Sequence, residues 1–153
     1  MVQKPGDPKP DPPGEGCSAP ESVTRPAGWN IIAAPEGTTI NVGPLYSVRP
    51  GAAYYDVLPA GSEAEAGVGY WAFFDANSET YFPLESPSYS VRLPANQWML
   101  IGNSGDDPAI VTGADEVFIY DTVSDAYIET YTIPAYTGAW AISYTGAVVT
   151  IKP

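Results

Sequence analysis

The sequence of 153 residues contains no histidine, and this absence excludes more chemistry than any other feature of the composition. Histidine is the commonest general base, and Ser-His-Asp triads, Cys-His pairs and nearly every catalytic zinc site depend on it. A carboxylate pair could still hydrolyse a glycoside, but Glu63 and Glu65 lie in a run of small residues without aromatic neighbours. Solvated surface charge explains them better. We therefore expect no catalytic residues, no cofactor and no enzyme.

Cysteine and basic residues are also scarce. Cys17 is the only cysteine, so no disulfide can form within the chain. Six Lys and Arg stand against 18 Asp and Glu, which gives a net charge of −12. A body this acidic repels nucleic acid and anionic lipid surfaces, so neither is an expected partner. There is no apolar run of 18 residues and no apolar signal core after Met1, and we expect synthesis in the cytosol.

Acidic residues crowd one stretch of the second half of the chain. Oxygen ligands suit calcium, but the tight alternation of Asp or Asn around a central glycine is missing. Exposed turn residues are the better interpretation, and we expect no metal site. The residues of this stretch are Asp106, Asp107, Asp115, Glu116, Asp121 and Asp125.

The residues that are abundant favour β structure. Hydrophobic residues make up 44% of the chain, enough for a packed interior, and the 11 Tyr and 4 Trp favour pleated sheet. The 17 Pro and 15 Gly divide the chain into short pieces, and no helical periodicity continues for ten residues. The sequence predicts an all-β fold of about a dozen short strands, arranged as a sandwich or as paired small barrels.

The tryptophans indicate an internal duplication. Trp29 precedes Trp71 by 42 residues, and Trp98 precedes Trp140 by the same 42. A shift of 69 residues also places Gly69-Tyr-Trp on Gly138-Ala-Trp. Each tryptophan lies in an apolar run, which predicts equivalent core positions, although tryptophans on an exposed sheet face would instead stack on sugar rings.

The duplication divides the chain into four parts. Residues 1–26 form a Pro-rich extended arm, 27–84 the first β repeat, 85–95 a connection and 96–153 the second β repeat. Within these parts, 59–66 reads as a surface loop and Tyr89–Leu93 alternates as a strand does. The arm has no apolar face with which to fix its own shape, so we expect a neighbouring subunit to hold it. The arm residues assigned to assembly are Pro5, Pro8, Pro10, Pro12, Pro13 and Pro20.

Several tyrosines lie outside the continuous apolar runs and are candidates for an interface, because protein interfaces favour tyrosine. They are Tyr54, Tyr55, Tyr127, Tyr131 and Tyr136.

Two resemblances follow from these patterns. Gly28-Trp-Asn and Gly69-Tyr-Trp in the first copy, with Ile101-Gly-Asn in the second, resemble a β repeat common at the ends of large bacterial surface proteins. In that family the pattern is Gly-Trp-Asn-Leu-Ile-Gly-Asn-Pro with Gly-Tyr-Trp downstream. The repeat has no settled activity, so this resemblance implies architecture only.

By organisation rather than motif, the chain resembles a decoration (cement) protein of a tailed-phage head. Such proteins are small, β-rich, non-catalytic and trimeric, and often carry a Pro/Gly-rich N-terminal arm. This resemblance implies a structural protein of the capsid exterior, made in the host cytoplasm, whose partners are its own copies and a capsid lattice. The alternative is a carbohydrate- or surface-binding β module of a larger exported bacterial protein, located at the cell surface or outside the cell.

Overall fold

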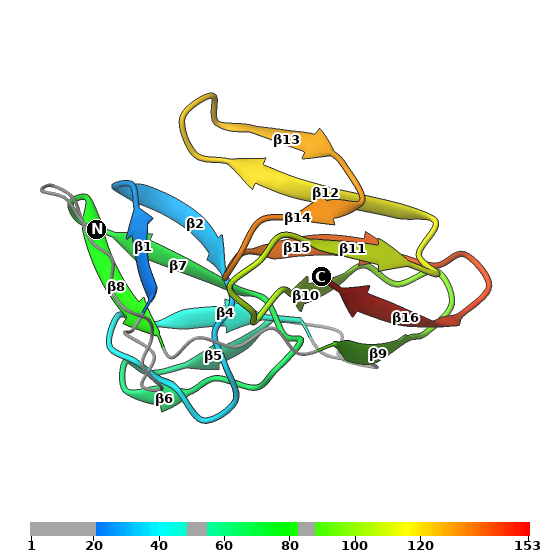
Figure 1. Ribbon diagram of the computed structural model, residues 1–153, viewed down its shortest axis with the longest axis horizontal. Coiled ribbons are helices and arrows are strands. Elements are labelled where there is room, and N and C mark those ends of the chain that lie inside the picture. Colours follow the sequence, from blue (N-terminus) through cyan, green and yellow to red (C-terminus); the bar gives the residue numbers. More distant parts are fainter. Residues whose placement is uncertain (1–20, 49–54, 83–87) are drawn as a thin grey trace, which may run out of the picture.

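The computed structural model describes residues 21–48, 55–82 and 88–153 (Figure 1). These residues form sixteen strands and no helix, which confirms the predicted all-β fold. Every pairing between named strands is antiparallel. With strands alone, the described part of the chain contains no helix that could cross a membrane.

The first eight strands form one half of the molecule, on the left of Figure 1. Its main sheet has the order β2-β7-β4-β5, and two two-stranded sheets, β1-β8 and β3-β6, complete the half. The strands are β1 (Glu21–Arg25), β2 (Gly28–Ile32), β3 (Thr39–Ile40), β4 (Leu45–Ser47), β5 (Asp56–Leu58), β6 (Ser62–Glu63), β7 (Tyr70–Phe74) and β8 (Ser78–Phe82).

The last eight strands form the other half. Its main sheet has the order β10-β15-β12-β13, and it packs on a second sheet with the order β14-β11-β16-β9. The strands are β9 (Tyr89–Leu93), β10 (Met99–Gly102), β11 (Ala109–Thr112), β12 (Glu116–Asp121), β13 (Ala126–Glu129), β14 (Thr132–Ile133), β15 (Gly138–Ile142) and β16 (Ala147–Lys152).

The two halves share one pattern of strand pairing. Each pairing in the first half has its counterpart eight strands later: β1·β8 matches β9·β16, β2·β7 matches β10·β15, and β4·β7 matches β12·β15. The same holds for β4·β5 with β12·β13 and for β3·β6 with β11·β14. The second half adds the pairing β11·β16, which joins its smaller strands into one sheet.

Each half has its own hydrophobic core, made by alternate residues of the strands. In β7 the side chains of Tyr70, Ala72 and Phe74 point inward, and in β15 those of Ala139 and Ala141 do so. Side chains two residues apart lie on the same face of a strand, so the residues between them must point the other way. The inner face of each main sheet is thus fully used for packing, and its outer face is left for other contacts.

The junction between the halves repeats the same backbone contacts on both sides. Gly102 N donates to Gly67 O at 2.9 Å, and 69 residues away in each strand Ala33 N donates to Tyr136 O at 3.0 Å. The bridge between Ile32 and Thr137 likewise matches the bridge between Val68 and Ile101. A β carbon on Gly69 would overlap the carbonyl oxygen of Ile101, so glycine lets the two backbones meet here.

The predicted boundaries need correction. The end of the predicted arm, Glu21–Arg25, is strand β1, because this stretch has no proline to prevent its pairing with β8. Val23 packs on the first core, so the first half begins before residue 27. The predicted loop 59–66 contains the short strand β6, paired with β3. The strand predicted at Tyr89–Leu93 is confirmed as β9.

Candidate functional site: an aromatic face with two depressions

The outer faces of the two main sheets carry aromatic side chains that are open to solvent. In β7, between the inward residues, Trp71 is half-buried and Phe73 is exposed. In β2, Trp29 is 43% exposed, and just before β10, Trp98 is 38% exposed. Aromatic side chains left this open on one continuous surface are uncommon in a soluble domain and mark a binding site.

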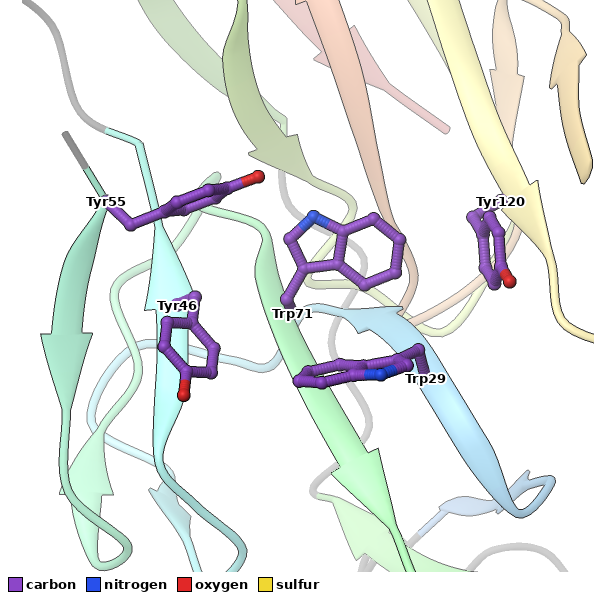
Figure 2. Close-up of a pocket in the computed structure, with 5 residues that line it drawn as sticks. All are labelled: Trp29, Tyr46, Tyr55, Trp71 and Tyr120. Atoms are coloured by element: carbon purple, nitrogen blue, oxygen red, sulfur yellow. The ribbon is translucent and has the colours of Figure 1, made fainter. Parts of the chain in front are cut away.

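The first-half depression is an open hollow of about 470 Å³. Figure 2 shows Trp71 in the middle, between Tyr55 and Trp29, with Tyr46 and Tyr120 on either side. The lining residues are Trp29, Tyr46, Tyr55, Trp71 and Tyr120. Four of them come from the sheet of the first half or its edge, and Tyr120 comes from β12, so the site crosses the junction.

The rings of the first-half depression meet at steep angles. Trp29 and Trp71 are edge to face, with centroids 6.1 Å apart and planes at 88°. Trp71 and Tyr120 lie 5.1 Å apart at 67°, and Tyr46 and Tyr55 lie 6.1 Å apart at 79°. Edge-to-face packing satisfies the ring quadrupoles and holds each ring in place. The rings therefore enclose a space instead of forming a flat platform.

The second-half depression has a volume of about 380 Å³ and lies on the other main sheet. It is lined by Trp98, Phe118, Tyr127 and Trp140. Ring contacts connect it to the first: Tyr55 lies 6.3 Å from Trp140, and Tyr120 lies 5.5 Å from Tyr127. The two hollows are parts of one aromatic face.

The strand registers show that four positions are the same in both depressions. Tyr46 stands opposite Trp71, as Phe118 stands opposite Trp140. Trp29 precedes the residue opposite Trp71 by two places, and Trp98 precedes the residue opposite Trp140 by two. By the same count Tyr55 matches Tyr127, since each lies two places before the partner of Tyr46 or Phe118.

Polar groups around the face modify it without covering it. The hydroxyl of Tyr120 donates a hydrogen bond to the Oδ1 of Asp125, which holds this ring. Burial raises the pKa of the Tyr55 phenol and nearby Tyr127 raises it further, against a hydrogen bond from Trp71 that lowers it. The Nε1 of Trp140 is buried and has no hydrogen-bond partner among the described residues.

The prediction that Trp29, Trp71, Trp98 and Trp140 are core residues is wrong. The apolar runs that contain them are strands with apolar residues on both faces, and the inward positions belong to their neighbours. In β15, for example, Ala139 and Ala141 fill the core while Trp140 lies on the outer face. The predicted equivalence of the four positions agrees with the registers, but they line depressions.

The predicted interface tyrosines divide into three groups. Tyr55 and Tyr127 are exposed and line the depressions, and Tyr131 is exposed elsewhere, where its hydroxyl donates to Asp115 O at 2.7 Å. Tyr136 is a correction, because its side chain is fully buried in the core of the first half. Tyr54 lies outside the described residues, as do the arm residues Pro5, Pro8, Pro10, Pro12, Pro13 and Pro20.

Three lining residues were not predicted from the sequence: Tyr46, Phe118 and Tyr120. Their signal was the two-residue alternation of β4 and β12, in which Leu45 and Ser47, and likewise Val117, are buried beside them.

The acidic residues of the second half serve turns. Asp121 accepts hydrogen bonds from Val123 N and from the Ser124 hydroxyl, and Asp115 accepts one from Tyr144 N. Within the described ranges, no group of three or more His, Cys, Asp or Glu side chains is placed to hold a metal ion.

Comparisons with known protein families, with curated proteins and with solved structures find no match for this chain.

Proposed function

We propose that the chain is a non-enzymatic module that binds a carbohydrate or another surface polymer on its aromatic face. The observation that carries this proposal is the pair of equivalent aromatic depressions on the outer faces of the main sheets. Two hollows with four matching positions suit a ligand whose units repeat along a chain.

The dimensions and lining of both depressions support the proposal. Small-molecule sites in proteins have volumes of about 300–1,000 Å³ and are lined mainly by apolar and aromatic side chains. The volumes of about 470 and 380 Å³ lie in this range. The rings are held by contacts with one another, so little side-chain entropy would be lost when a ligand binds.

The proposal is tested by titrating the full chain with a panel of soluble polysaccharides while following tryptophan fluorescence. We expect a saturable change for at least one polymer and a strong loss of affinity in a Trp29→Ala/Trp98→Ala double variant. The matched control is Tyr144→Ala, which removes an aromatic ring that is 46% exposed and lines neither depression. Equal affinity in the native protein and the double variant would remove the face from the binding site.

A homo-oligomeric structural protein is the second candidate, and exposure of the aromatic face also favours it. Tyrosine and tryptophan are enriched in protein interfaces, and such a face could lie against a second subunit or a capsid lattice. In this case the N-terminal arm would clamp neighbours, and the protein would be a trimer on the virion. Its mass in solution separates the candidates, because the binding module is a monomer. Deletion of residues 1–20 should then change the mass only if the arm holds subunits together.

A further inference from the structure

The walls of the first-half depression stand at steep angles, which limits the shape of the group it can take. A sugar ring stacks best on one flat aromatic face, whereas here the plane of Trp29 is at 88° to that of Trp71 and the plane of Tyr120 is at 67° to it. Figure 2 shows the central Trp71 with rings on four sides. A box of ring faces suits a compact, nearly spherical group that contacts several rings at once.

The charge around this box favours a cation. The faces of aromatic rings carry negative quadrupole potential and attract cations within about 6 Å of the ring centre. The chain has a net charge of −12, and neither Lys nor Arg is among the described residues that line the depression. The Asp125 carboxylate accepts the hydrogen bond of the Tyr120 hydroxyl, which shifts electron density into that ring.

We propose that the first-half depression binds a quaternary ammonium group, such as a trimethylammonium substituent on the polymer. This inference rests on the proposed function and names the chemical group that enters the site. A trimethylammonium head has no N–H to donate, so it needs no hydrogen-bond acceptor, and its charge is spread over methyl groups that pack against ring faces. The lining of five aromatic rings meets both requirements.

The second-half depression serves as an internal comparison. It has the same four positions, but strand register places Val48 where the first half has the wall Tyr120 of its partner sheet. It also has no phenol held by a carboxylate among its lining residues. With fewer walls, it should bind the same cation more weakly, so we expect one strong and one weak site.

The probe is choline, compared with 3,3-dimethyl-1-butanol, in which a carbon atom replaces the nitrogen and removes the charge. Isothermal titration of the full native chain should show choline binding at least tenfold more tightly than the neutral alcohol. Equal binding of the two probes would show an apolar pocket without cation selectivity and would overturn the inference, as would no binding of choline.

Three variants locate the site. Trp29→Ala should weaken choline binding at least tenfold, and Tyr144→Ala should leave it unchanged. Asp125→Asn should weaken choline binding two- to fivefold without affecting the neutral alcohol; Asn tolerates the left-handed backbone at this position, where φ is 55°. Unchanged choline affinity in Trp29→Ala would place the cation elsewhere and overturn the inference.

The inference and the proposed function can fail separately. If a polysaccharide binds in a tryptophan-dependent way but choline does not, only the ammonium assignment falls. If neither binds, the proposed function falls with it.

Discussion

The two halves of the molecule make the same depression with different walls, and the differences lie where the halves meet. Trp29, Tyr55 and Trp71 of the first half have the counterparts Trp98, Tyr127 and Trp140 in the second. The first-half depression borrows a fifth ring from the other sheet, whereas the second-half depression is lined by four rings of its own sheet. Strand register thus determines where rings can lie, and the junction determines how many enclose each space.

A second pair of equivalent positions shows how one backbone conformation can hold very different residues. Gly67 and Tyr136, 69 residues apart, both have positive φ, of 79° and 54°. Such a backbone is costly for any residue except glycine, and for a tyrosine the surrounding structure must enforce it. Tyr136 is held by burial in the core of the other half. At Gly67 the nearby space is occupied by Val91 and Tyr89, so no side chain is needed there.

This comparison is tested most severely by Tyr136→Ala. Removing a fully buried aromatic ring should lower the free energy of unfolding by about 3–5 kcal/mol, because a cavity remains in the first core. Urea unfolding at neutral pH measures the change, and Tyr144→Ala, an exposed tyrosine, should stay within about 0.5 kcal/mol of the native protein. If the two variants lost equal stability, Tyr136 would not join the halves.

The next effect concerns the glycines at the junction. In Gly69→Ala the new methyl group meets a backbone oxygen of Ile101, and in Gly138→Ala its nearest neighbour is the Ile31 side chain at 2.5 Å. A side chain can move aside more easily than backbone, so Gly69→Ala should cost about 2–3 kcal/mol and Gly138→Ala about 1 kcal/mol less. Urea unfolding compares the two variants.

Gly37→Ala is the control for the junction variants, since it has positive φ but nothing within 4 Å of the added carbon. It should cost only the conformational penalty, about 1 kcal/mol. The opposite order, with Gly138→Ala the more damaging, would contradict the junction geometry.

The sequence predicted the all-β class and the equivalence of the tryptophans, but not the face on which they lie. In Tyr70–Phe74 both sets of alternate residues are apolar, Tyr70 and Phe74 on one side and Trp71 and Phe73 on the other. Hydrophobicity cannot choose between two apolar faces of a strand. The choice depends on which residues fit the thin core, and in β15 only the alanines are small enough.

Tyr136 was missed for a different reason. It lies in a polar, Pro-rich stretch that suggests an exposed turn, and its partners are residues such as Ile32 and Phe74, far away in the sequence. Long-range packing of this kind leaves no local pattern. Its counterpart Gly67 was the one available signal, because a glycine at the matching position indicates an unusual backbone conformation.

A third test compares the indole nitrogens of the two central tryptophans. Trp71 donates a hydrogen bond to Tyr55, whereas Trp140 Nε1 is buried without a partner among the described residues. Trp71→Phe and Trp140→Phe remove similar ring area, so their difference isolates the hydrogen bond. Trp71→Phe should cost about 0.5–1.5 kcal/mol more in urea unfolding. Equal losses would mean that Trp140 finds an acceptor in solution.

The smallest expected effect is the alkaline titration of Tyr55. Burial raises its pKa above the ordinary value of 10.0, so the folded state holds this proton more tightly than the unfolded state does. The stabilising effect of the protonated phenol is complete below pH 10 and is lost as the pH rises through the folded pKa. Between pH 9 and pH 11 the native protein should therefore lose more stability than Tyr55→Phe does, as urea unfolding at the two pH values would show.

Two neighbours of Tyr55 give this titration a direction that can be reversed. Trp71→Phe removes the hydrogen bond that lowers the pKa of Tyr55, so that pKa should rise further. Tyr127→Phe removes the charge that raises it, so the pKa should fall toward 10. Absorbance at the phenolate band, with the Tyr55→Phe curve of each background subtracted, follows this one group. Since Tyr127 belongs to the second-half depression, a shift in that variant would show that the two depressions are electrostatically coupled; an unchanged curve would mean that they titrate independently.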